Sequence, residues 1–146
     1  MKSQSEGAIS LSFSSAPDGV ALTGGAAGQR GLDMGTVSNA GGSRNANVQV
    51  QKMAGHFVAS TKFALSIQAG QQNSSTATVL AALAVPDPSF TFRLDGITLA
   101  TAPRMIQGQA RIGTTFTHRL EIDVPTTLTE KNSQLHNAII FQVIPN

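Results

Sequence analysis

The chain of 146 residues contains no cysteine, tryptophan or tyrosine, and only 12% of its residues are charged. The absence of cysteine excludes disulfides, thiolate metal sites and cysteine nucleophiles. Ordinary soluble domains carry about 25% charged residues, so this chain has an unusually neutral composition. Its ten cations and eight anions are spread along the whole length. The pI of about 9.5 therefore does not indicate a basic patch, and nucleic-acid binding is not predicted.

Long hydrophobic runs are also missing. No apolar stretch approaches the length of about 18 residues that a transmembrane helix needs. Residues 1–7 are polar, and no apolar signal-peptide core follows them. We expect residues 1–7 to form a flexible leader and residues 8–146 to form one domain. The neutral composition, rich in serine, threonine and glycine, favours a mature extracellular or cell-surface chain over a cytosolic one.

The clearest local pattern lies in residues 90–99, where two alternating runs flank Asp95-Gly96. Asp-Gly between such runs is the strongest short-range signal for a two-residue β-hairpin turn. The register then places Phe92 opposite Leu99, and five apolar side chains share one face. These five are Phe90, Phe92, Leu94, Ile97 and Leu99.

Alternation recurs along the rest of the chain. It is clearest in residues 9–13, 63–67 and 116–124, and a β-branched run occupies residues 139–144. Residues 77–85 are compatible with a helix, but Pro86 and Pro88 beyond them favour a buried strand. A second Asp-Gly pair, at Asp18-Gly19, suggests a hairpin after the first strand, although that strand can also pair elsewhere. The pattern predicts an all-β sandwich, immunoglobulin-like or jelly-roll, of about eight to ten short strands.

Candidate catalytic and metal-binding residues are scattered. His118 lies on the apolar side of a strand and is expected to be a core histidine, whereas His56 and His136 fall near turns. Glu121 and Asp123 share an outward face, which suits a solvated strand better than a cation site or an acid–base couple. No spacing matches a metal site or a nucleophile–base pair, so we expect no catalytic, cofactor-binding or metal-binding residue.

Two further local patterns have simple explanations. Gly25, Gly28 and Gly31 have a spacing seen in phosphate-binding loops, but no helical pattern follows them, so a loop is expected. Sugar-binding platforms usually rely on tryptophan and tyrosine, which stack on pyranose rings. The absence of both residue types argues against a carbohydrate-binding site of that kind.

Two stretches resemble a known family pattern. Residues 32–37, Leu-Asp-Met-Gly-Thr-Val, resemble an element near the start of secreted bacterial β-sandwich domains related to pilins. Residues 118–125 and 137–143 resemble the last two strands of those domains. The resemblance implies an immunoglobulin-like, pilin-like subunit of a fibre or surface coat and supplies no catalytic residue.

The start of the domain has the composition of a donor strand. Pilins of that kind polymerise when an alternating N-terminal strand completes a neighbour's sheet. In residues 8–14, the apolar side chains Ile9, Leu11 and Phe13 alternate with small ones. These three residues are our candidate subunit interface. The alternative is that they form the first strand of their own domain.

Together these features favour a non-enzymatic structural protein, a subunit of an extracellular filament, pilus or surface layer that self-associates into a homopolymer. The alternative is a β-sandwich module that binds a surface or glycan ligand, or a viral coat or spike domain. An enzyme is the least favoured class.

Overall fold

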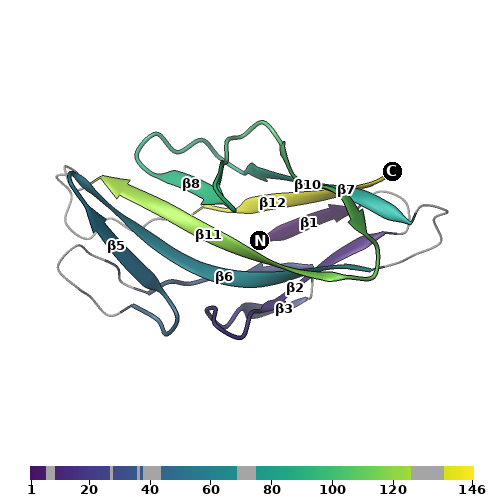
Figure 1. The fold of residues 1–146 in the computed structure, drawn as a ribbon, viewed down its shortest axis with the longest axis horizontal. Helices are drawn as coiled ribbons and strands as arrows, with labels where there is room; N and C mark the ends of the chain where they lie inside the picture. The colour runs from purple at the N-terminus through teal and green to yellow at the C-terminus, as the bar shows by residue number, and fades with distance from the viewer. Residues whose placement is uncertain (6–8, 27, 36, 38–43, 69–74, 126–136) are drawn as a thin grey trace.

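A computed structural model describes residues 1–5, 9–26, 28–35, 37, 44–68, 75–125 and 137–146. These residues form twelve strands and no helix (Figure 1). The strands are β1 (Lys2–Ser5), β2 (Ser10–Ser15), β3 (Thr23–Ala26), β4 (Gln29–Gly31), β5 (Gln49–Met53), β6 (His56–Gln68), β7 (Thr76–Leu83), β8 (Thr91–Leu94), β9 (Ile97–Thr98), β10 (Arg104–Arg111), β11 (Thr115–Pro125) and β12 (Ile139–Pro145). Accordingly, the described part of the chain contains no helix that could cross a membrane.

The strands form two sheets. Sheet A has the order β10-β7-β12-β1-β4-β3, and sheet B has the order β2-β6-β11-β8-β9, with β5 also paired to β6. The predicted β-sandwich is therefore confirmed. The strand count exceeds the eight to ten expected because the short strands β1, β3 and β4 occupy segments that we expected to be leader or loop.

The core lies between the two sheets and is built by the predicted alternation. Leu11 and Phe13 of β2, and Phe63, Leu65 and Ile67 of β6, are buried. They meet the buried side chains of sheet A, which include Val79, Phe141 and Val143.

Three phenylalanine rings join the sheets at the centre of this core. The ring centroid of Phe141, from sheet A, lies 5.1 Å from that of Phe13 and 5.9 Å from that of Phe63, both from sheet B. Phe13 and Phe63 are 6.3 Å apart. These separations are typical of favourable aromatic pairs, so the contact adds to the stabilisation gained from apolar burial.

The predicted hairpin at Asp95-Gly96 is confirmed. Leu94 pairs with Ile97, and the Leu99 amide donates to the Phe92 carbonyl over 2.8 Å. Asp95 and Gly96 both have positive φ, 51° and 82°, as a type I′ turn requires. Of the five apolar residues placed on one face, Phe92, Leu94 and Leu99 are buried and the other two are half-buried.

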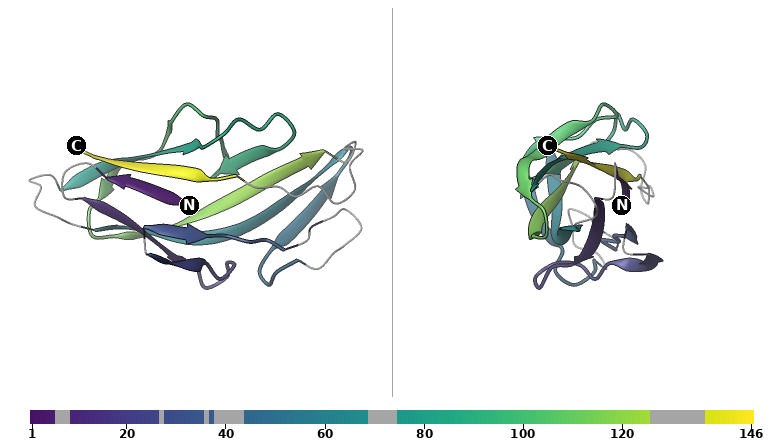
Figure 2. Two further views of the ribbon diagram at one scale, coloured as in Figure 1. Left: turned by 180° about the vertical axis from the view of Figure 1, so that it is seen from behind. Right: turned by 90° about the vertical axis from the view of Figure 1, so that its right-hand side faces the viewer.

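Within the expected flexible leader of residues 1–7, the described residues 1–5 are not a free segment. Lys2–Ser5 form β1, which pairs in parallel with β12 over four residues (Figure 2). The Met1 amino group donates to the carbonyl oxygen of Arg30, and its partial burial lowers the pKa of this group. The first residues are ordered because they complete a sheet. Residues 6–8 lie outside the described part of the chain.

The Asp18-Gly19 pair closes a turn, in which the Gly19 amide donates to the Ala16 carbonyl. It does not open a regular hairpin, because β2 pairs with β6 over six residues instead. The segment after the turn is fastened to β6 through side chains, as described below. The sequence left open that the first strand pairs elsewhere than in this hairpin, and the structure shows that it pairs with β6.

Gly96→Val should destabilise the fold by about 1–2 kcal/mol, since a left-handed conformation costs this much for residues with a β-carbon. Space is not the reason, because a β-carbon at Gly96 would have no neighbour within 4 Å. Urea denaturation measures the change. Gly96→Asn, whose side chain tolerates positive φ, is the control and should lose less; equal losses would show that conformation is not the cause.

Candidate functional site

Two ion pairs in the described part of the chain share one carboxylate, that of Asp123 of β11, on the outward face of sheet B. One carboxylate oxygen of Asp123 lies 2.7 Å from Nδ1 of His56, at the start of β6. The other accepts from two guanidinium nitrogens of Arg93, on β8, over 3.2 and 3.3 Å. Three strands are therefore tied together at this carboxylate.

This arrangement bears on the predicted role of Glu121 and Asp123. The two share an outward face, as their spacing predicted, and Glu121 lies directly opposite Arg93 in the ladder. Asp123 is only 15% exposed, and both of its oxygens are already engaged by cationic or hydrogen-bonding side chains. The geometry makes Asp123 a cross-link between strands rather than an open ligand for a cation.

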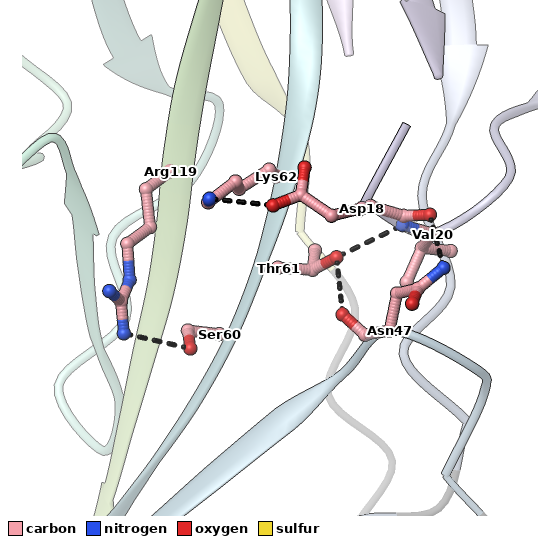
Figure 3. Close-up of polar contacts among 8 residues, drawn as sticks. Asp18, Val20, Asn47, Ser60, Thr61, Lys62 and Arg119 are labelled. Carbon is pink, nitrogen blue, oxygen red and sulfur yellow. Dashed lines mark hydrogen bonds and ion pairs between the residues drawn. The ribbon is translucent and has the colours of Figure 1, made fainter. Parts of the chain in front are cut away.

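Further along the same face of sheet B, the polar side chains of Arg119 and Ser60 lie on the paired strands β11 and β6. Arg119 of β11 donates to Oγ of Ser60 over 3.2 Å, and the Ser60 side chain is buried although it points outward (Figure 3). A buried hydroxyl without a partner would destabilise the fold, so the guanidinium both covers and satisfies this group.

The segment that follows β2 is anchored to β6 by a hydrogen-bond network (Figure 3). The Thr61 hydroxyl accepts from the Val20 amide over 3.0 Å and donates to the Asn47 carbonyl over 3.1 Å. The Asn47 side chain donates to the Gly19 carbonyl. Thr61 is 4% exposed, so its hydroxyl joins three segments that are distant in the sequence.

Outside this network, Lys62 donates to Asp18 over 2.7 Å. The hydrogen bond from Lys62 lowers the pKa of the Asp18 carboxyl below its ordinary value. Both side chains are substantially exposed, so the pair adds little to stability.

Glycine is required at position 19 because the turn lies very close to the backbone of β6. A β-carbon at this position would lie 1.9 Å from the Lys62 carbonyl oxygen and 2.8 Å from its carbonyl carbon. Both are backbone atoms of β6, which cannot rotate away as a side chain can. Only glycine allows the turn to lie against β6 and form the Thr61 network.

Of the three histidines, the structure describes His118 and His56. His118 is 4% exposed, as the core prediction required, but its Nδ1 bonds the carboxylate of Asp95 rather than a backbone group. The other oxygen of Asp95 accepts from the Arg119 amide over 2.8 Å. The β8–β9 turn is thereby fastened to β11. His56 is half-buried beside Asp123, and His136 lies outside the described residues.

The glycine-spaced segment is not the predicted loop. Gly25 and Gly31 fall within β3 and β4, which pair with each other, and Arg30 donates to the Gly24 carbonyl. Glycine-rich strands carry no alternating pattern, so sequence periodicity could not reveal this pair.

The candidate subunit interface lies inside its own chain. Ile9, Leu11 and Phe13 are 0%, 2% and 1% exposed, and β2 pairs with β6 of the same chain. Of the two arrangements that the sequence left open, the isolated chain adopts the one in which this strand belongs to its own domain.

No group of three or more histidine and acidic side chains that could hold a metal ion occurs among the described residues. Comparison with models of known protein families gave no match, and comparison with curated proteins gave none either. The resemblance to pilin-related domains therefore has the two-sheet architecture as its only further support.

Gly19→Ala should destabilise the protein by about 1–3 kcal/mol, the usual range for overpacking. The added β-carbon forces the turn away from β6 and breaks the bonds to Thr61. Gly108→Ala is the matched control, because a β-carbon there meets only the flexible end of Met105. Urea denaturation of both variants measures the difference, and equal stability would contradict the close-approach argument.

The double variant Ile9→Asp, Leu11→Asp should fail to fold. Each lost apolar side chain removes roughly 1.5–3 kcal/mol, and each buried carboxylate adds a further penalty. The control is Ser10→Asp, Ser12→Asp, which places the same charges on the opposite face of β2 and should fold. Circular dichroism separates them. A folded monomer carrying the first pair of changes would mean that residues 8–14 serve a neighbouring chain.

Proposed function

We propose that this chain is a structural subunit of an extracellular filament, pilus or surface layer, in which copies join by β-strand addition. The observation that carries the proposal is that both sheets are open and end in edge strands. An edge strand presents backbone N–H and C=O groups that pair with a strand of another chain. The resemblance of residues 32–37, 118–125 and 137–143 to pilin-related domains points the same way.

The surface composition supports association of this kind. Charged side chains are one of the devices that keep edge strands apart, and only 12% of this chain is charged. Large apolar side chains are exposed near sheet edges. Met53 on β5 is 43% exposed and Met105 on β10 is 58% exposed. Such side chains gain burial when a neighbouring copy covers them.

The test is light scattering and electron microscopy of the purified chain over a concentration series. We expect the mean mass to rise with concentration and ordered particles of repeating subunits to appear. Particles of single-chain mass at every concentration, without ordered assemblies, would contradict the proposal. A chain that remains single but binds immobilised glycans would favour the ligand-binding alternative.

A further inference from the structure

The edges available to a second chain are not equivalent. β9 has two residues, and β3 has four with an irregular register. β10 has register shifts at two places and carries Arg104 and Arg111 at its ends, and both features discourage pairing. The free side of β2 is approached by sheet A, where the Ser3 hydroxyl donates to the Leu11 carbonyl.

β5 is longer than β3 and β9, has no register shift and carries one charged residue where β10 carries two. Its five residues pair with β6 in unbroken register, from Gln49 opposite Ser60 to Met53 opposite His56. Four of the five are exposed, and the strand contains no proline and a single charge, that of Lys52. A regular, exposed and weakly charged edge is the kind that accepts another strand.

The hairpin geometry shows which backbone groups are free. Met53 and His56 flank the two-residue turn formed by Ala54 and Gly55, so this closing pair shares backbone hydrogen bonds. Hydrogen-bonded and non-hydrogen-bonded pairs alternate along an antiparallel ladder. The N–H and C=O groups of Val50 and Lys52 therefore point away from β6, toward the open edge.

We propose that β5 pairs in antiparallel fashion with β5 of a second copy, about a two-fold axis at Gln51. Val50 then faces Lys52 of the second copy on both sides of the axis, and the free backbone groups form four hydrogen bonds. Gln49 faces Met53 in the same register. No like charges lie directly opposite each other, so the strand is complementary to itself.

This inference rests on the proposed function and deepens it, because it names one edge and one partner. The pairing extends sheet B across both copies in the strand order β6-β5-β5-β6, in which the last two strands belong to the second copy. A two-fold joint is closed by itself, so a filament needs a second, different contact on each copy.

The test uses two double variants with opposite charge patterns at exposed positions. Gln49→Glu, Met53→Lys places opposite charges across the axis twice, whereas Gln49→Lys, Met53→Lys places like charges there. Each cross-strand pair contributes a modest amount, so we expect the dissociation constants to differ by about fivefold or more in opposite directions from the parent chain. Sedimentation equilibrium measures them, and 1 M salt should shrink the difference.

A backbone variant checks the ladder itself. Lys52→Pro removes an outward N–H without touching the bonds to β6, and it should abolish the pairing, while Lys52→Ala should retain it. Circular dichroism verifies that every variant is folded, and the charge pair decides the question if the proline variant is not.

The possible failures are distinguishable. If the parent chain assembles but the two charge variants behave alike and Lys52→Pro still associates, then β5 is not the joint and another edge is used. If the parent chain stays single at all concentrations, the proposed function fails together with this inference.

Discussion

The contact among Phe13, Phe63 and Phe141 is the interaction on which the rest of the structure depends. It is where β2 and β6 of sheet B meet β12 of sheet A, and all three rings are buried. The remaining buried side chains of both sheets pack around these rings, so the contact lies at the centre of a continuous core. Because Phe13 belongs to β2, this strand is a structural part of its own domain, which explains why its apolar residues are not free to serve a neighbour.

Polar contacts around this core hold strands and turns in place. The Thr61 hydroxyl holds the segment around Val20 against β6, and the carboxylate of Asp95 holds the β8–β9 turn against β11. Asp123 links three strands of sheet B. Each of these groups is a potential reactive side chain that is used instead to fasten a strand or a turn. Among the titratable groups, Asp95, His118 and Asp123 therefore link strands and turns of sheet B.

The same architecture leaves its edges unequal. The free side of β2 is approached by β1, whose Ser3 hydroxyl donates to the Leu11 carbonyl, and the pairing of β10 contains register shifts. The regular strand β5 of the β5–β6 hairpin is therefore the most suitable edge for another strand. A protein whose surface is weakly charged and whose backbone is free along one regular strand has the properties that strand addition requires. In the proposed assembly, the free backbone groups of β5 form the hydrogen bonds between copies, and such bonds depend little on side-chain identity.

The sequence by itself determined the features that depend on neighbouring residues. Alternation predicted β11 and residues 63–67 of β6, a β-branched run predicted β12, and Asp95-Gly96 predicted a turn and its register, because side-chain parity, β-propensity and positive φ are local properties. The tertiary structure alone decided the pairing of β1 with β12, the close approach of Gly19 to Lys62 and the partners of His118 and Asp123. These features join residues far apart in the chain, and no local pattern specifies which distant backbone or carboxylate will arrive beside them.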